Sequence, residues 1–387
     1  MSGHCGWIID GAVASDRHFE QALALASSVR RYRRTPRMFA GWLSRDVVDE
    51  LTDATELRFF PDSQLTPFIT AEQFRKFSTA KTAPAPGLNQ VVQMVNAPSA
   101  WSRATGENVY IAVVDSGING QHPEFPDWKK AGGWSHDGSD PWTDFSGHGT
   151  MCAVIAAGNP ARRARLCGVA PNAKLYSCKT EYRISEIIAA YEWVEDQRDA
   201  HQRPVVISNS FGYKVKDPPQ ENGMLIERDH PLCHVIRRVV GSGIPMVFAA
   251  GNNHDPQQAT QCTPSTIWAW NSMEEVLTVA EVDENHSVRP YSSRGPGQWA
   301  SQHCPKPDCA APTFGWILFD STYKCAAEGW GTSGAAPQAA GLLSLLLERD
   351  PQAPAAVLYD RIRTSCRSLG AGRNCVGSGL IDCDAAL

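Results

Sequence analysis

Long apolar runs and strong charge bias are both missing from this sequence of 387 residues. The net charge is -5, from 36 basic and 41 acidic side chains, and no run of lysine or arginine is long enough to follow a phosphate backbone. We therefore expect no nucleic-acid partner. The first sixteen residues hold only a five-residue apolar stretch before Asp10, too short for a signal-peptide core or a membrane span. We expect no membrane partner, a cytoplasmic chain as the sequence is written, and a secreted one if a leader has been removed.

Metal-binding cysteine spacings are also absent. The twelve cysteines form no CxxC pair, and the spacing of Cys304 and Cys309 is only a weak hint of a metal site. Their even number suits disulfides, so we expect structural thiols or disulfides rather than zinc. No contiguous loop rich in Asp and Asn is visible, which leaves open whether a structural Ca²⁺ is bound and leaves the metal unknown.

Residues 1–66 alternate strand and helix patterns that predict a small α+β domain. The basic cluster 30–34 follows the first predicted helix, and a solvated last turn favoured by the helix dipole accounts for it. Residues 67–90 are rich in proline and poor in periodic apolar positions, which is typical of a linker. The predicted elements are a strand at 7–9, a helix from Asp16 through Val29, a strand at 38–43, a helix after Ser44 and a strand at 56–60.

Residues 91–387 repeat buried strand, turn and helix, which predicts an α/β domain with a mostly parallel sheet and helices on both faces. Functional groups in such sheets lie at the carboxyl ends of strands, where Asp115 and Asn252 fall. The predicted strands are 109–114, 174–178, 204–209, 245–249 and 276–279. The predicted helices are 149–157, 184–198, 231–240 and 334–348.

Three short motifs occur in the order Asp, His, Ser. They are Val113-Val114-Asp115-Ser116-Gly117-Ile118, Gly147-His148-Gly149-Thr150 and Gly331-Thr332-Ser333-Gly334-Ala335-Ala336-Pro337. Together they resemble the three signatures of the subtilisin-like serine protease family (S8). The segment Ala249-Ala250-Gly251-Asn252 is similar to the family's oxyanion segment, and Cys152 to the free cysteine of its proteinase K and kexin branches.

The resemblance implies that Asp115, His148 and Ser333 form a catalytic triad and that Asn252 stabilises the oxyanion. A serine hydroxyl is a weak nucleophile at neutral pH, so Ser333 needs His148 as a base within hydrogen-bond reach. Asp115 would fix the imidazole tautomer and stabilise the imidazolium. The implied reaction is endopeptidase cleavage through an acyl-enzyme, with no cofactor required for catalysis.

The resemblance also implies where a protein or peptide substrate binds. An extended substrate would pair with Ser210, Phe211 and Gly212 by β-augmentation. The opposite wall would hold small side chains that leave room for the residue before the scissile bond. Those wall residues are Ala249, Ala250 and Gly251.

Residues 1–66 resemble the family's inhibitory propeptide in element order alone. As a zymogen's propeptide they would act as an intramolecular inhibitor, place the linker in the active site and be removed by a cut between about Gln64 and Asn89. A permanent N-terminal domain is the alternative. For the whole chain, two functions compete with proteolysis: a peptide ligase or macrocyclase that uses the same acyl-enzyme, and a catalytically silent binding protein.

Overall fold

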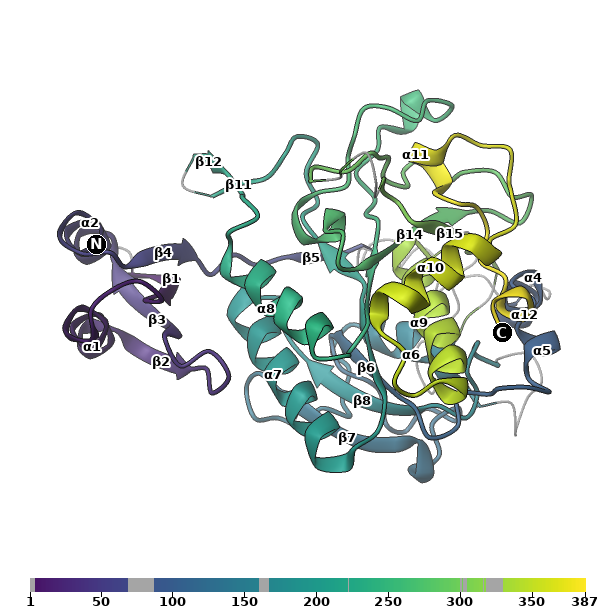
Figure 1. The fold of residues 1–387 in the computed structure, drawn as a ribbon, viewed down its shortest axis with the longest axis horizontal. Helices are drawn as coiled ribbons and strands as arrows, with labels where there is room; N and C mark the ends of the chain where they lie inside the picture. Colours follow the sequence, from purple (N-terminus) through teal and green to yellow (C-terminus); the bar gives the residue numbers. More distant parts are fainter. Residues whose placement is uncertain are drawn as a thin grey trace.

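The computed structural model describes residues 4–68, 87–159, 167–221, 223–299, 301, 305–315, 317 and 330–387. A small N-terminal sheet with two helices lies beside a larger α/β part that carries the C-terminus (Figure 1). None of the helices in these ranges combines the length and the apolar character needed to cross a membrane.

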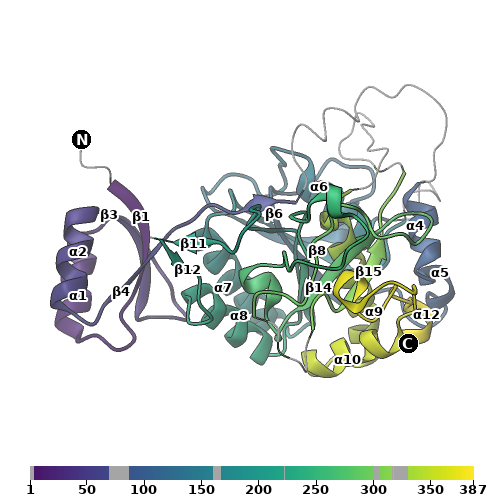
Figure 2. The ribbon, with the colours of Figure 1, turned by 90° about the horizontal axis from the view of Figure 1, so that it is seen from above.

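The small part contains β1 (His4–Asp10), α1 (Asp16–Leu25), β2 (Ser27–Arg31), β3 (Met38–Ser44), α2 (Arg45–Ala54) and β4 (Arg58–Pro61). Its four strands form an antiparallel sheet in the order β2-β3-β1-β4. Both helices cover the outer face of this sheet, away from the larger part (Figure 2). A separate hydrophobic core lies between these helices and the sheet. In it the Phe19 and Phe39 rings meet edge to face, with ring centroids 5.4 Å apart.

The first predicted helix was wrong at both ends. Ser15, rather than Asp16, caps it, because the Ser15 hydroxyl accepts the His18 N–H at 3.3 Å. The helix ends at Leu25, and Val29 lies in β2, where the backbone pairs with β3. Tertiary pairing has overridden a helical spacing that continued past the real end of the helix.

The prediction that the basic cluster 30–34 is a solvated helical turn was also wrong. The cluster begins in β2 and lies against α7 (Ile184–His201) of the larger part. The Glu192 carboxylate accepts the backbone N–H groups of Arg33 and Arg34, each at 2.9 Å. The Arg34 guanidinium donates to Asp196 at 2.8 Å. Local sequence carries no sign of these acidic partners, because they come from a helix more than a hundred residues later.

The larger part is built on strands β6 (Tyr110–Asp115), β7 (Lys130–Ser135), β8 (Lys174–Lys179), β9 (Val205–Asn209), β13 (Met246–Ala249), β14 (Leu277–Val282) and β15 (Cys309–Pro312). They form a seven-stranded parallel sheet in the order β15-β14-β13-β9-β6-β8-β7. The main helices are α6 (His148–Ala157), α7, α8 (Pro231–Gly241), α9 (Thr332–Arg349) and α10 (Ala355–Ser365). Shorter elements of the described ranges are α4 (Leu88–Met94), α5 (Ala97–Ala100), β5 (Thr66–Pro67), β10 (Phe211–Gly212), β11 (Gln220–Glu221), β12 (Met224–Leu225), α11 (Arg373–Val376), α12 (Cys383–Ala386) and the 3-10 helices η1 (Asp127–Lys129), η2 (Pro256–Gln258) and η3 (Ala269–Ser272).

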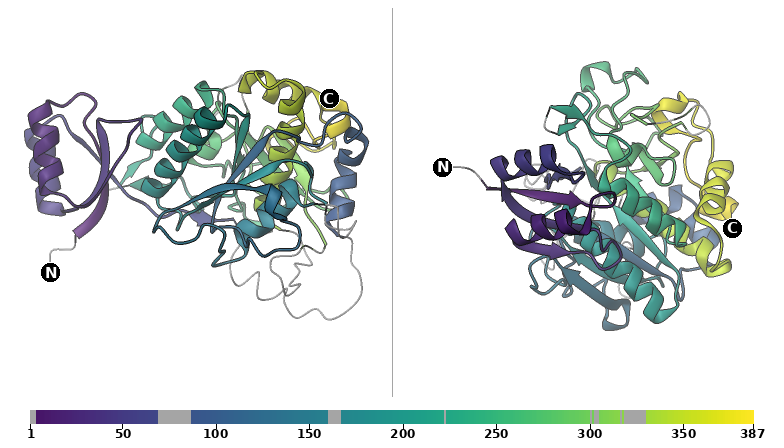
Figure 3. Two further views of the ribbon diagram at one scale, coloured as in Figure 1. Left: turned by 90° about the horizontal axis from the view of Figure 1, so that it is seen from below. Right: turned by 60° about the vertical axis from the view of Figure 1, so that its left-hand side comes forward.

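Helices cover both faces of this sheet, which confirms the predicted α/β class (Figure 3). Alternate residues of β6 show how the two faces are filled, since side chains alternate along a strand. Ile111 and Val113 pack in the core cluster that contains α6 and α9. Ala112 and Val114 pack in the cluster that contains α7 and α8. Strand β6 is thus buried on both faces of the sheet.

Cysteines in the described ranges serve as thiols and in one disulfide, between Cys262 and Cys375. Cys309 lies in β15 as a buried thiol. Cys304, the other member of the weak spacing hint, lies outside the described residues. The expectation of structural thiols or disulfides fits these positions.

Candidate active site

The carboxyl ends of three neighbouring strands and the amino ends of two helices meet at one place. Asp115 is the last residue of β6, Ser210 follows β9, and Asn252 lies three residues beyond β13. His148 begins α6, and Ser333 is the second residue of α9. The strand order changes direction at β6, so the meeting point lies at a topological switch point of the sheet.

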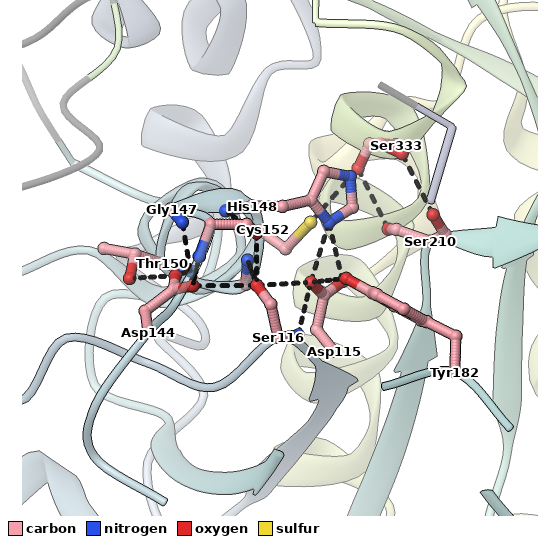
Figure 4. Close-up of polar contacts among 12 residues, drawn as sticks. Asp115, Ser116, Asp144, Gly147, His148, Thr150, Cys152, Tyr182, Ser210 and Ser333 are labelled. Atoms are coloured by element: carbon pink, nitrogen blue, oxygen red, sulfur yellow. Dashed lines mark hydrogen bonds and ion pairs between the residues drawn. The ribbon is translucent and has the colours of Figure 1, made fainter. Parts of the chain in front are cut away.

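Asp115 and His148 form a buried pair, each only 1% exposed. The His148 Nδ1 atom lies 2.7 Å from Asp115 Oδ1 and 2.9 Å from Oδ2. In Figure 4 the imidazole stands between the Asp115 carboxylate and Ser333. A ring that donates its Nδ1 proton to a carboxylate presents Nε2 to the other side as a proton acceptor.

Two further residues donate to the Asp115 carboxylate. The Ser116 backbone N–H donates to Oδ1 at 2.8 Å and the Tyr182 hydroxyl donates to the same oxygen at 2.8 Å. Burial, followed by the Asp115 charge, raises the pKa of Tyr182 well above its ordinary value, so the hydroxyl keeps its proton. No sequence motif pointed to Tyr182, which lies 67 residues from Asp115.

A second carboxylate, Asp144, fixes the start of α6. It accepts the backbone N–H groups of Gly147 and Thr150 at 2.8 Å each and the Ser116 hydroxyl at 2.8 Å. A negative charge is favourable at a helix amino end, where backbone N–H groups lack partners within the helix. The network ties the loop before His148 to the residue after Asp115 and so sets the distance between the pair.

The Ser333 side chain is fully buried and donates its hydroxyl to the Ser210 carbonyl at 3.0 Å. The Ser210 hydroxyl in turn donates to the Ser333 carbonyl at 3.0 Å. Gly331, just before α9, has φ of 66°, which favours glycine, and a Cβ there would lie 2.4 Å from the Phe68 carbonyl oxygen. The approach to Ser333 therefore admits a peptide carbonyl only because residue 331 has no side chain.

The Asn252 amide is aimed at that same carbonyl. Its Nδ2 donates to the Phe68 oxygen, and its Oδ1 accepts the Thr332 N–H at 3.1 Å and the Thr332 hydroxyl at 3.0 Å. Because Thr332 only donates to Oδ1, the amide orientation is fixed with its N–H groups toward Phe68. Asn252 is thus held as a donor to the carbonyl of residue 68.

Residues 65–68 lie in the predicted substrate groove. Strand β5 pairs antiparallel with β10, with Pro67 opposite Phe211 and Thr66 opposite Gly212. The Phe68 N–H donates to the Ser210 carbonyl at 3.1 Å, and the Leu65 N–H donates to the Tyr182 carbonyl at 2.8 Å. Residues from the junction of the predicted N-terminal domain and linker therefore occupy the edge that was predicted to bind substrate.

The Phe68 ring lies between two glycines. A Cβ on Gly212 would lie 2.7 Å from Phe68 Cζ, and one on Gly251 would lie 3.4 Å from it. Of the other predicted wall residues, Ala249 ends β13 and Ala250 donates its N–H to β14, and both are buried. The Asn271 amide donates to the Ala249 carbonyl at 2.8 Å and braces this wall.

Comparison with known proteins gives the family. Residues 106–379 match the subtilase family (Peptidase S8). The chain belongs to the subtilase family. Mycosin-1 of Mycobacterium tuberculosis is 30% identical over 321 residues, which cover 73% of this chain and 69% of mycosin-1. Subtilisin E of Bacillus subtilis is 30% identical over 307 residues, which cover 76% of this chain and 70% of subtilisin E.

Solved structures agree with this subtilase fold. The structure of MycP1 with its N-terminal propeptide removed matches with a TM-score of 0.56 at 25% identity, covering 76% of this chain and 95% of MycP1. Fervidolysin from Fervidobacterium pennivorans, a keratinolytic enzyme related to subtilisin, matches with a TM-score of 0.71 over 100% of this chain and 61% of its own. At 16% identity the second likeness supports the fold alone. The subtilase is a serine peptidase, and its substrates are proteins or peptides.

Cys152 of this subtilase lies beside the pair. Its thiol and the ligand atoms of Asp115 and His148 lie within 4.8 Å of one another, the one such group of possible metal ligands in the described ranges. Its Sγ faces the Ser333 carbonyl oxygen at 3.6 Å. Burial, followed by the Asp115 charge, raises the pKa of the Cys152 thiol well above its usual value, so it stays protonated and packs as a small apolar side chain.

Proposed function

We propose that this subtilase is an endopeptidase in which Asp115, His148 and Ser333 are the catalytic triad and Asn252 is an oxyanion donor. The observation that carries the proposal is the position of Phe68. Its carbonyl oxygen accepts from the Asn252 amide. Its N–H donates to the Ser210 carbonyl, which also accepts the Ser333 hydroxyl. A peptide carbonyl that meets a fixed amide donor beside a serine is arranged for acyl transfer.

In the proposed reaction the Ser333 hydroxyl turns from the Ser210 carbonyl to His148, loses its proton to Nε2 and attacks the carbonyl carbon. Asp115 stabilises the imidazolium without becoming protonated itself. The Asn252 amide and the backbone N–H groups at the start of α9 face the oxygen that becomes negative. His148 then protonates the leaving amine, and water cleaves the acyl-enzyme by the reverse sequence.

The proposal extends to the N-terminal part as an intramolecular inhibitor and first substrate. Leu65 through Phe68 fill the groove, and the four-stranded sheet that precedes them packs on α7 and α8. The Phe68 carbonyl oxygen accepts from the Asn252 amide, so the scissile bond we propose is the peptide bond on the carbonyl side of Phe68. We propose that cleavage there separates residues 1–68, within the range of 64 to 89 expected for a propeptide cut.

Intact mass, measured before and after reaction with a fluorophosphonate, tests the proposal on wild type and Ser333→Ala. Wild type should lose residues 1–68 and gain one adduct, and the variant should stay whole and unlabelled. An uncut wild type without adduct would contradict the proposal and favour a silent binding protein. A labelled wild type that passes the acyl group to an added amine in preference to water would favour a ligase.

A further inference from the structure

Tyr182 adopts a backbone conformation that large side chains rarely take. Its φ is 66°, in the left-handed region, where a bulky residue is an outlier. The residue lies just before α7 and is 5% exposed. Strained backbone of this kind persists where surrounding contacts determine it, and such residues cluster at functional sites.

The hydroxyl of Tyr182 contacts the proposed triad. It donates to Asp115 Oδ1 at 2.8 Å, the same oxygen that lies 2.7 Å from His148 Nδ1 (Figure 4). Because the carboxylate is 1% exposed, its charge depends on protein donors rather than water. Tyr182 thus supplies Asp115 with a hydroxyl donor from outside the two motifs around Asp115 and His148.

The backbone and ring of Tyr182 contact the groove. Its carbonyl accepts the Leu65 N–H at 2.8 Å, so it forms the groove edge opposite β10. Its ring meets the Phe211 ring of β10 edge to face, with centroids 5.7 Å apart. One residue therefore joins both edges of the groove to the carboxylate of the triad.

We propose that Tyr182 is a positioning residue that holds Asp115 in place and makes this hold depend on a peptide strand docked in the groove. A strand that reaches the Leu65 position fixes the Tyr182 backbone through its carbonyl. The fixed backbone keeps the hydroxyl on Asp115. The inference rests on the proposed triad and adds to it a link between the length of the bound substrate and the turnover rate.

Tyr182→Phe tests the link, with Tyr359→Phe as control. Tyr359 is also a buried tyrosine, but its hydroxyl hydrogen-bonds to the Met246 backbone instead of the site. Mature enzymes are compared on two anilides, Leu-Thr-Pro-Phe and Pro-Phe. For the longer one, kcat of Tyr182→Phe should fall about tenfold with little change in KM, since a hydrogen bond to a charged group is lost. The rate advantage of the longer anilide should shrink in Tyr182→Phe alone.

The pH profile of kcat/KM gives a readout that simple destabilisation would not move. With one donor lost, the Asp115 carboxylate binds the protonated imidazole more tightly, so the acidic limb should move to higher pH. Incorporation of 3-fluorotyrosine at position 182, a stronger donor, should move the limb to lower pH and needs no loss of packing. Wild-type kcat and an unmoved limb in both variants would overturn the inference. A wild type and Tyr359→Phe that both fail to turn over would instead overturn the proposed function.

Discussion

The N-terminal sheet and the seven-stranded sheet are held in place by different forces. The seven-stranded sheet is buried on both faces by apolar clusters. The N-terminal sheet has its own small core, and a narrow apolar strip of its inner face joins the larger part, formed by Ile8, Tyr32, Met38 and Ala40 with Phe60 packed beside them. Around this strip the contacts are ion pairs and hydrogen bonds, for which water can substitute. The seven-stranded sheet is therefore held mainly by apolar burial, whereas the N-terminal sheet is held on the larger part mainly by polar contacts, which suits its proposed release.

Asp62 illustrates the polar side of this comparison. Its carboxylate accepts the Ser185 N–H at 2.8 Å and the Ser185 hydroxyl at 2.7 Å, at the start of α7. Burial raises the pKa of Asp62 above its ordinary value. Burial therefore disfavours the ionised form of Asp62, and this free-energy cost disappears when the two parts separate and water reaches the carboxylate.

The largest effect should follow from a change in the site that leaves both sheets intact. Asn252→Ala removes the amide that faces the Phe68 carbonyl and should lower kcat roughly 10²- to 10³-fold, the cost known for loss of one oxyanion donor in subtilisin. Steady-state kinetics on the Leu-Thr-Pro-Phe anilide measures it. The exposed Asn285→Ala is the control and should behave as wild type. A loss in Asn252→Ala confined to KM would contradict the assignment.

The next effect concerns the contact between linker and groove. Phe68→Asp places a charge between Gly212 and Gly251, where the ring now packs, and burying it should slow self-cleavage by about 100-fold or more. The rate is followed by intact mass after dilution from denaturant. Val357→Asp, which adds a charge at a half-exposed position on α10, should process normally. Equal rates in all three proteins would place the cut elsewhere.

The buried carboxyl group of Glu281, in the larger part, should make the stability of the protein depend on pH. Burial raises the pKa of Glu281 to about 7 from an ordinary 4.5, so the folded state binds its proton more tightly than the unfolded state. Stability is then lost as pH rises from 4.5 through 7, and by pH 8 this group costs roughly 3 kcal/mol. Glu281→Gln in a Ser333→Ala background should remove that loss in urea unfolding. A stability difference that is the same at pH 5 and pH 8 would contradict this cause.

The smallest effect should come from the interface. Glu192→Gln weakens the acceptor of the Arg33 and Arg34 N–H groups and should shorten the lifetime of the cut but still bound N-terminal part about tenfold. Native mass spectrometry over time measures the release. Asp49→Asn, which breaks the exposed pair with Arg45 inside the N-terminal part, should not change it. Faster release in both variants would show general loosening of that part.

The sequence predicted the central strands because each is a short buried apolar run. It failed for β7 and β15. Gly132 and Gly133 leave β7 with little apolar signal, and β15 is four residues long and ends at Pro312. Both strands are the outermost of the sheet. The outer side of β15 is hydrogen-bonded to residues 379–381, a contact that its own short sequence does not indicate.

The active site likewise contains residues that local sequence predicts and residues that only tertiary contacts bring in. The four proposed catalytic residues stand in contiguous motifs, whose local pattern carries their chemistry. Tyr182 could not be predicted, because its contact with Asp115 exists only once β6 and β8 lie side by side. The linker was expected in the active site, but its composition did not indicate which residue would meet Asn252. That choice depends on the register of β5 against β10, which only the folded chain defines.

The pairing of β5 with β10 also has a kinetic consequence. A chain whose first scissile bond already lies beside its own nucleophile matures in a first-order process, so its half-time does not depend on how dilute the protein is. Later substrates arrive by collision, and their cleavage scales with enzyme concentration. Under the proposed cleavage the chain needs no neighbour to become active, and a single isolated molecule completes the step.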